Sequence, residues 1–377
     1  MKNRKIFGNY FNNILSVTAL SVFLLSGCGP TVVSASEPEN AANTSSAVTN
    51  DTSSQNPGTE STSINADGSF NIDSVGEFTI RFGVNNGDQI QILKIVDDHT
   101  GFLKERGINL ETTEFAAGIN TIDAITLGQL DVGLFADYAG VNRIGNTLND
   151  TELRAFTNIG VVDSYELYVN PETIKTGEDL LTANLVSQAG VVFEYEYGKL
   201  FEYYNLDPKD VHLVNVTSAQ EALSLAASGG GDAYWANPTI KDMFAEQGWV
   251  PFISIGDIGA PMYTYNVANE SYLTEHRDEV TKFLIVSEEA FRYIDENLDE
   301  VAGWVEAEIG LKKDLVIKSW KEREHKYSFG QAEYEALKNV KDWCFQNGNF
   351  DTDYDVADFI NTDSLNAAFP DRVNWER

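Results

Sequence analysis

Short hydrophobic runs with two different periods alternate along the chain from about residue 77 onwards. Strand-like alternation covers Phe78–Val84, Ile108–Thr113 and Asp131–Ala136, and helical spacing covers Asp88–Lys104 and Asn120–Leu127. Period-2 patterns are typical of half-buried strands, and apolar residues three and four positions apart are typical of amphipathic helices. Strands that alternate with helices predict an α/β body with a largely parallel sheet.

The same order returns in the next part of the chain, before long amphipathic helices take over. Helices are expected at Tyr197–Tyr204, after a capping box formed by Ser218 and Glu221, and from Pro238 to Gly248. Arg154–Val162 and Glu166–Val169 are expected as further strands of the first part. The strands expected in the second part are Gly190–Phe193, Val211–Val216, Asp232–Trp235, Phe252–Ile255 and Tyr263–Ala268. From residue 277 onwards helical patterns dominate. The sequence therefore predicts two α/β units followed by a helical C-terminal region.

Two stretches of the chain are similar to each other. Residues 122–137 and 220–237 each contain a helix, a turn of small residues, an aspartate and a short strand that ends in an aromatic residue, Ala and Asp or Asn. The similarity fits either an internal duplication or the general helix–turn–strand pattern of α/β proteins. We expect Asp131 and Asp232 to cap turns. Polar residues after the strands are ligand candidates, because ligands bind at the carboxyl ends of strands in α/β sheets.

The first 30 residues carry the pattern of a secreted, lipid-anchored protein. Lys2, Arg4 and Lys5 precede an apolar run at 14–25, which is shorter than the roughly 20 residues that span a bilayer. The run ends at Leu25-Ser26-Gly27-Cys28, which resembles the cleavage box of bacterial lipoproteins, in which the cysteine receives lipid. We expect a signal peptide at 1–27 and lipid on Cys28. The alternative is an ordinary signal peptide with an incidental cysteine.

A segment rich in Ser, Thr, Asn, Ala, Pro and Gly follows Cys28 and extends to about Val75. No Lys or Arg occurs between Lys5 and Arg81, and such a composition buries too little apolar area to offset its ordering entropy. We expect residues 28–76 to form the lipidated end and a disordered tether. If Cys28 carries lipid, Cys344 has no partner in the chain, and its helix-like surroundings favour a small buried side chain.

Charge and composition exclude several kinds of function. The chain holds 58 Asp and Glu against 26 Lys and Arg, a net charge of −32, whereas nucleic-acid binding requires clustered cations that neutralise phosphates. The 2 cysteines exclude a disulfide framework and a four-cysteine zinc site. The 4 histidines lie far apart, which argues against a histidine-based metal site. We therefore expect no nucleic-acid partner, no metal and no cofactor.

Four passages together resemble the type II periplasmic substrate-binding proteins of ATP-driven (ABC) importers. They are Leu127–Gly133, Tyr204–Asn215, Ser228–Pro238 and Asp342–Gly348. Each passage by itself matches the family only weakly, but the order and spacing of the four passages are specific. The resemblance covers about Phe78 to Val373. The most similar subgroup serves nitrate, aliphatic sulfonates, taurine and thiamine-precursor pyrimidines.

The resemblance implies a two-lobed fold that closes on a solute and then docks on a membrane permease. Lobe one would comprise residues 77–163 plus 263–377, with the C-terminal helices, and lobe two residues 164–262. The chain would cross between the lobes near Val162–Ser164 and Gly259–Pro261. This implies a monomeric receptor, not an enzyme, that is lipid-anchored on the extracytoplasmic face of the cell membrane. Its partners would be a small solute and the permease subunits.

Twelve polar or aromatic residues follow predicted strands or lie at a crossing, and we expect them to line the ligand site. They are Asn85, Asp88, Gln89, Asn120, Asp137, Tyr138, Ser164, Tyr165, Glu194, Tyr195, Trp235 and Asn237. Simpler roles stay open for some of them, such as a helix cap for Glu194 and core packing for Trp235.

The chemistry of these candidates favours a neutral or cationic ligand. Nitrate and sulfonate binders usually have a turn of small residues where this chain has Glu194-Tyr195-Glu196, because such a turn exposes backbone N–H groups to an anion. Carboxylates there, together with Asp137 and with no arginine among the candidates, would repel an anion. Aromatic rings and carboxylates suit a flat, amine-bearing heterocycle such as a thiamine-precursor pyrimidine. An aliphatic sulfonate, taurine or nitrate is the alternative.

Two other classes of function stay open. The first is an enzyme on the same fold, since the resemblance extends to thiamine-pyrimidine synthases. Those proteins carry a cysteine-rich motif that this chain lacks, and the sequence has no Ser-His-Asp order, HExxH motif or Walker loop. The second is a surface sensor or adhesin. Adjacent permease and ATPase genes would favour the receptor, and an adjacent kinase gene would favour the sensor.

Overall fold

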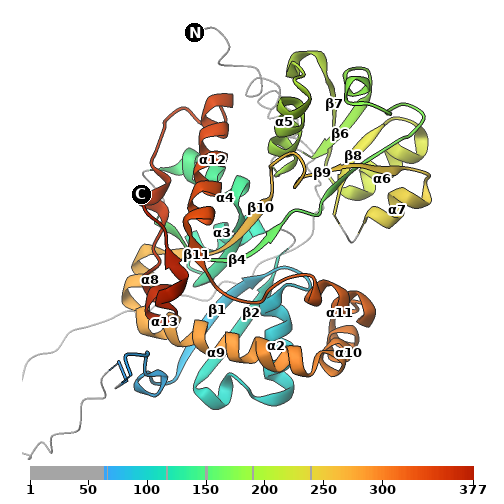
Figure 1. The fold of residues 1–377 in the computed structure, drawn as a ribbon. Coiled ribbons are helices and arrows are strands. Elements are labelled where there is room, and N and C mark those ends of the chain that lie inside the picture. Colours follow the sequence, from blue (N-terminus) through green and yellow to red (C-terminus); the bar gives the residue numbers. More distant parts are fainter. Residues whose placement is uncertain (1–62, 66, 116–117, 149–151, 189–190, 238–239) are drawn as a thin grey trace, which may run out of the picture. The chain divides into compact units, whose positions relative to one another are not determined.

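Two five-stranded sheets form the centre of the folded body (Figure 1). The computed structural model describes residues 63–65, 67–115, 118–148, 152–188, 191–237 and 240–377. These residues belong to one compact unit. Helices connect the strands of both sheets, and a helical region completes the chain. The α/β fold class with a helical C-terminal region is confirmed.

Sheet one has the strand order β2-β1-β3-β10-β4. β1 pairs in parallel with β2 and β3, whereas β10 runs antiparallel to β3 and β4. The apolar positions of β1, Ile80, Phe82 and Val84, are fully buried, as expected for a strand inside an α/β sheet. The strands are β1 (Phe78–Val84), β2 (Ile108–Glu114), β3 (Val132–Ala136), β4 (Leu153–Val162) and β10 (Met262–Asn269).

Three helices connect the strands of sheet one: α2 (Gln89–Thr100), α3 (Gly118–Thr126) and α4 (Asp137–Thr147). The sequence pattern did not reveal α4, because its glycines and asparagines have low helix propensity. The helix begins directly after β3, so Asp137 and Tyr138 lie in its first turn.

Sheet two has the strand order β7-β6-β8-β5-β9. β6 pairs in parallel with β7 and β8, and β5 runs antiparallel to β8 and β9. The strands are β5 (Glu166–Val169), β6 (Asn184–Gln188), β7 (His212–Val216), β8 (Ala233–Ala236) and β9 (Val250–Ser254). The helices of this part are α5 (Phe193–Tyr204), α6 (Ala219–Ser228) and α7 (Lys241–Glu246).

The two sheets are built alike, with three parallel strands and an antiparallel fourth strand in equivalent places. Asp131 and Asp232, which precede β3 and β8, make equivalent contacts. Asp131 Oδ2 accepts a hydrogen bond from the backbone N–H of Arg81 at 2.8 Å, and Asp232 Oδ2 accepts one from Asn184 at 2.8 Å. Each aspartate therefore binds the backbone of the neighbouring strand, β1 or β6, rather than capping a turn as the sequence predicted. The common strand order supports an internal duplication.

The strand predicted at Gly190–Phe193 is wrong. β6 ends at Gln188, Val191 and Val192 lie in a bend and a turn, and Phe193 is the first residue of α5. β-branched and aromatic residues favour a strand locally. In the fold they lead into a helix whose residues Phe193 and Tyr197 are buried.

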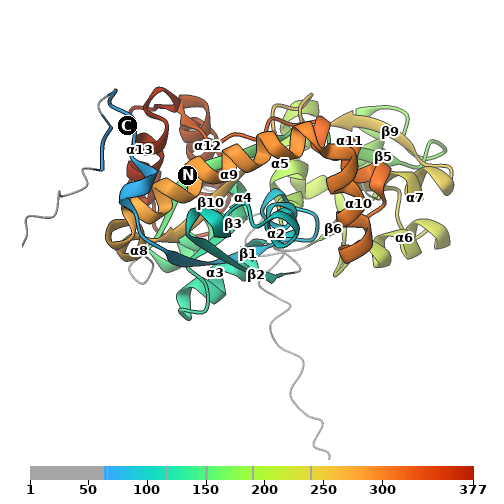
Figure 2. The same ribbon diagram turned by 90° about the horizontal axis from the view of Figure 1, so that it is seen from below.

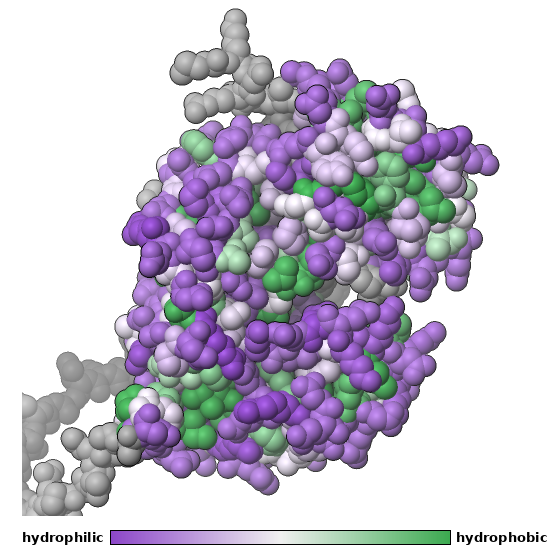
Figure 3. Space-filling model, viewed as in Figure 1, coloured by the Kyte–Doolittle hydropathy of each residue, from purple (hydrophilic) through white to green (hydrophobic). Residues whose placement is uncertain are grey.

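The C-terminal region packs mainly on sheet one. α9 lies along this sheet (Figure 2), and the rings of Phe283 and Phe82 are 5.8 Å apart. The helices of the region are α8 (Glu270–Glu275), α9 (Arg277–Glu296), α10 (Leu298–Ile309), α11 (Lys313–Lys321), α12 (Gln331–Asn347) and α13 (Asp363–Ala368). A short parallel pair joins β11 (Phe329–Gly330) to β12 (Val373–Asn374). Hydrophilic residues cover most of the face seen in Figure 3, in keeping with the large excess of acidic residues.

The chain passes from sheet one to sheet two between β4 and β5, and it returns between β9 and β10. The expected tether includes residues that contact the folded body: Phe70 is 7% exposed, and Lys282 Nζ donates to the carbonyl of Val75 at 2.9 Å. The expected signal peptide and Cys28 lie outside the described residues. Among those residues, the structure contains no helix with the length and apolar character needed to cross a bilayer.

Candidate functional site

Asp88 and Asn85 shape the turn that follows β1. The Asp88 carboxylate accepts hydrogen bonds from the N–H groups of Asn85 at 2.6 Å, Ile90 at 3.0 Å and Gln91 at 2.8 Å. Burial raises the Asp88 pKa to about 6, although these hydrogen bonds oppose the shift. Asn85 Nδ2 donates to the carbonyl of Phe115 at 2.8 Å. In this structure both side chains stabilise the backbone around the turn at the carboxyl end of β1.

Asp137 joins the end of β3 to β10. Its Oδ2 accepts from the backbone N–H of Tyr263 at 2.9 Å, and its Oδ1 accepts from that of Tyr138 at 2.7 Å. The residue is 1% exposed, and burial raises its pKa to about 7 despite both hydrogen bonds. Asp137 is therefore a buried acid that changes protonation near neutral pH.

Tyr138 brings α4 of sheet one into contact with α5 of sheet two. Its hydroxyl donates a hydrogen bond to the Glu194 carboxylate and accepts one from Asn349 Nδ2 at 3.1 Å. The Tyr138 ring stacks on Tyr195 with centroids 6.4 Å apart, and Trp343 packs edge-on against Tyr195 at 5.3 Å. Three sequence-predicted residues, Tyr138, Glu194 and Tyr195, therefore lie together.

Glu196 is the most unusual group of this region, and the sequence did not single it out as a ligand contact. Its side chain is 0% exposed, and neither carboxyl oxygen has a hydrogen-bond partner among the described residues. Burial raises its pKa well above the usual range, and the charge of Asp137 raises it further. A buried carboxyl without hydrogen bonds is costly. This cost makes Glu196 a candidate for contact with a ligand that donates hydrogen bonds.

Trp235, Asn237 and Tyr165 lie where the carboxyl end of β8 meets the start of β5. Trp235 is 0% exposed, and its Nε1–H has no acceptor among the described residues. Burial raises the Tyr165 pKa to about 12, with the charge of Glu196 as a further cause and a hydrogen bond to Asn237 opposing the shift. Trp235 thus packs in the core and still has an unused donor.

The other three candidates lie apart from this cluster or at its edge. Asn120 is exposed on α3. Ser164 is exposed at the first crossing and lines a cavity of about 510 Å³. Gln89 is buried at the start of α2, where its Oε1 lies 3.3 Å from His325 Nδ1 and its Nε2 has no partner among the described residues.

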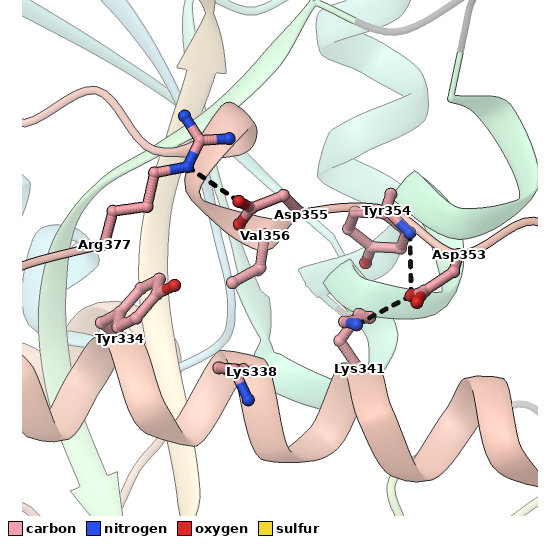
Figure 4. A pocket seen from close by; sticks show the side chains of 8 residues that line it. All are labelled: Tyr334, Lys338, Lys341, Asp353, Tyr354, Asp355, Val356 and Arg377. Carbon is pink, nitrogen blue, oxygen red and sulfur yellow. Dashed lines mark hydrogen bonds and ion pairs between the residues drawn. The ribbon is translucent and has the colours of Figure 1, made fainter.

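A second cavity, of about 460 Å³, lies between α12 and the last residues of the chain (Figure 4). Its cations are already paired, since Lys341 Nζ lies 2.8 Å from Asp353 Oδ1 and Arg377 Nε lies 2.7 Å from Asp355 Oδ2. It therefore offers a ligand little uncompensated charge. Within the described ranges, the structure has no cluster of three or more His, Cys, Asp or Glu side chains placed to hold a metal ion.

Comparison with known proteins identifies one family and several similar folds. The family model described as "NMT1/THI5 like" matches residues 92–300. No curated protein sequence is significantly similar to the chain.

Three solved structures illustrate the similarity of fold. SsuA from Escherichia coli, a periplasmic aliphatic sulphonate binding protein, is 18% identical with a TM-score of 0.63, over 78% of this chain and 100% of that chain. The alkanesulfonate-binding protein SsuA from Xanthomonas axonopodis pv. citri, bound to MOPS, is 15% identical with a TM-score of 0.61, over 76% and 99%. A mutant of DszB, a desulfurization enzyme, in complex with biphenyl-2-sulfinic acid is 14% identical with a TM-score of 0.58, over 78% and 99%.

Proposed function

The chain belongs to the NMT1/THI5-like family, and on this premise we propose that it is an extracytoplasmic solute receptor. The receptor captures one small organic molecule between its two lobes and delivers it to the permease of an ABC importer. The fold supports this proposal, because the same architecture occurs in periplasmic solute-binding proteins. The contact between Tyr138 and Glu194 also supports it, since it joins elements of the two sheets next to the candidate ligand residues.

The buried carboxyl of Glu196 carries the proposal about the ligand. Both of its oxygens are without partners among the described residues, so an occupant with N–H donors would satisfy them. Trp235 Nε1–H offers a donor to an acceptor such as a ring nitrogen. Tyr138 and Tyr195 supply aromatic surface. These groups together fit a neutral or cationic heterocycle with amino groups, such as a thiamine-precursor pyrimidine.

Protonation distinguishes this ligand class from the alternative, an aliphatic sulfonate, taurine or nitrate. A cationic ligand is favoured when Asp137 and Glu196 are ionised, whereas an anion requires both acids to stay protonated. Burial raises the pKa of both groups, that of Asp137 to about 7. Affinity for an anion such as ethanesulfonate would therefore fall as the pH rises through neutrality.

Isothermal titration with the hydroxymethyl-aminopyrimidine precursor of thiamine tests the proposal directly. We expect Glu196→Gln to weaken binding about tenfold or more, because it removes the stronger acceptor. Glu246→Gln, an exposed change on α7, is the matched control and should bind like the wild type. Tight binding of ethanesulfonate or taurine without a response to the pyrimidine would refute this ligand class.

We propose a binding role rather than a catalytic one. Cys344 is the free cysteine of the described residues and is buried. Burial raises its pKa well above the usual range, which disfavours the thiolate that a cysteine nucleophile requires. Turnover of the bound pyrimidine, followed by mass spectrometry, would contradict the binding role.

We also propose that lipid on Cys28 holds the receptor, as a monomer, on the extracytoplasmic face of the cell membrane. This proposal rests on the apolar run and the cleavage box of the sequence. Anchoring at the membrane would keep the receptor close to its permease.

A further inference from the structure

The chain just before β1 forms a small hairpin, in a part of the sequence where a disordered tether is expected. Ile64 and Phe70 form an antiparallel bridge, and the N–H group of Asn71 donates to the carbonyl of Ser63 at 2.9 Å. We call the described residues between 63 and 75 the N-terminal hairpin. Because an isolated hairpin of two short strands is barely stable in water, contacts with the rest of the protein must hold it in place.

The apolar side chains of the N-terminal hairpin differ in their burial. Phe70 is 7% exposed, whereas Ile64 is 52% exposed. Ile72, which follows the hairpin strands, packs against the hydrophobic core of the folded body. Burial of apolar surface is the main favourable term when two parts of a protein pack together. Phe70 and Ile72 therefore bind the hairpin to the folded body, and Ile64 contributes less.

Two polar contacts place the hairpin along the first two turns of α9. Ser63 Oγ donates a hydrogen bond to Asp278 Oδ2 at 3.4 Å, and Lys282 Nζ donates one to the carbonyl of Val75 at 2.9 Å. Asp278 and Lys282 are four residues apart in α9, so they lie on the same face of the helix. Both ends of the hairpin are thus fastened to one helix face.

Lys282 indicates that the hairpin is a constant part of the fold. The residue is 5% exposed, and burial lowers its pKa. Within the described part of the chain, Lys282 makes no ion pair, and the Val75 carbonyl is its hydrogen-bond partner. A buried ammonium without an acceptor is costly. Loss of the hairpin would therefore destabilise the packing around the start of α9.

The hairpin lies far from sheet two. Figures 1 and 2 both show it next to α13 and the start of α9, at the end of the sheet-one part that lies away from sheet two. α9 itself packs on sheet one, with the rings of Phe283 and Phe82 5.8 Å apart. A rotation of sheet two relative to sheet one would therefore leave the contacts of the hairpin with α9 intact.

We propose that the N-terminal hairpin fastens the membrane tether to lobe one at the start of α9, so that the anchor holds lobe one and lobe two moves when the receptor opens and closes. This inference rests on the proposed receptor function and on the proposed lipid at Cys28. The tether would then end at Ser63, and a pull from the membrane would act on α9 rather than on the ligand site. Closure would proceed without any change in the attachment to the membrane.

Hydrogen exchange followed by mass spectrometry tests whether the hairpin is docked. The full-length protein is compared with Phe70→Ala, Lys282→Met and the control Ile64→Ala, and melting curves establish that each variant is folded. We expect the amides of residues 63–75 to be protected in the wild type and in Ile64→Ala, and to exchange about tenfold faster or more in the other two variants. Absence of protection in the wild type, or unchanged protection in both Phe70→Ala and Lys282→Met, overturns the docking.

Distances between pairs of spin labels test which lobe moves. In a full-length Cys28→Ser, Cys344→Ala background, one label is placed at Ile64→Cys. The second is placed at Leu127→Cys, directly after α3 of the sheet-one part, or at Tyr203→Cys on α5, since both side chains are exposed. We expect a narrow distance distribution between the hairpin and Leu127. The hydroxymethyl-aminopyrimidine precursor of thiamine should leave that distance unchanged and alter the distance to Tyr203.

The outcomes separate this proposal from the receptor function. A broad distribution between the hairpin and Leu127 overturns the docking, with or without a bound ligand. A ligand-induced change in that distance, with the distance to Tyr203 unchanged, overturns the assignment of lobe two as the moving lobe. If the first distribution is narrow and the pyrimidine alters neither distance, the docking is supported and the proposed ligand class fails.

Discussion

The indole of Trp343 on α12 donates a hydrogen bond from Nε1 to Glu202 Oε1 at 3.1 Å, and its six-membered ring lies against Gly198 on α5. A methyl group at Gly198 would overlap that ring. α12 packs on α4 of sheet one, whereas α5 belongs to sheet two. This contact therefore joins the two parts of the protein, and the same indole packs edge-on against the predicted ligand residue Tyr195.

Gly198→Ala should weaken ligand binding by favouring separation of α5 from α12. We expect a loss of about five- to tenfold in affinity, because apparent affinity scales with the population of the closed state. Calorimetry measures the affinity, and small-angle scattering of the ligand-free protein measures the opening. Gly303→Ala on α10, where an added methyl group meets no atom within 4 Å, is the matched control. Equal affinities in the two variants would exclude a role for this contact in closure.

Asp137→Asn should flatten the pH dependence of stability in the ligand-free protein. The folded-state pKa of Asp137 is about 7, above the value of about 3.9 for an unfolded aspartate. Between these values the folded state holds a proton that the unfolded state has released, so stability is lost as the pH rises from about 4 to about 7. The variant should reduce that slope by up to about 1.4 kcal/mol per pH unit.

Urea unfolding at several pH values measures this slope. Asp299→Asn, whose side chain is 85% exposed, is the control and should keep the wild-type slope. The same slope in Asp137→Asn would mean that Asp137 is ionised throughout this range.

Tyr138→Phe should destabilise the protein by about 1–2 kcal/mol, because the Glu194 carboxylate and the Asn349 amide lose a shared partner. The ring and its stacking on Tyr195 are kept. The control is Tyr334→Phe, since the hydroxyl of Tyr334 makes no hydrogen bond with the residues that the structure describes. Denaturant midpoints compare the two, and equal stabilities would show that the Tyr138 hydroxyl contributes nothing.

Cys28→Ser should move the protein from the membrane fraction to the soluble fraction, because a serine cannot receive the thioether-linked lipid. Partition between detergent and aqueous phases measures the change. Cys344→Ala, which alters the buried cysteine, should leave the partition as in the wild type. Continued membrane retention of Cys28→Ser would refute the lipoprotein prediction.

Much of the fold could be predicted from local sequence, because the periodicity of apolar residues is itself a local property. β1, β2 and α9 follow directly from it, whereas the contacts of Asp131 and Asp232 with the neighbouring strands β1 and β6 do not. The start of α5 could not be predicted in this way. Val191, Val192 and Phe193 favour a strand locally, and only their packing against the rest of the fold starts a helix at Phe193.

That helix start decides the role of Glu196. In a turn before Tyr197 the side chain would face solvent, but in a helix that begins at Phe193 it lies three residues later, on the buried side with Leu200. The sequence was therefore sufficient for the fold class, for the alternation of elements and for the family resemblance. The contacts of Tyr138 with Glu194 and Tyr195 depend on chain segments far apart in sequence. Long-range packing alone brings such residues together, because no local periodicity encodes it.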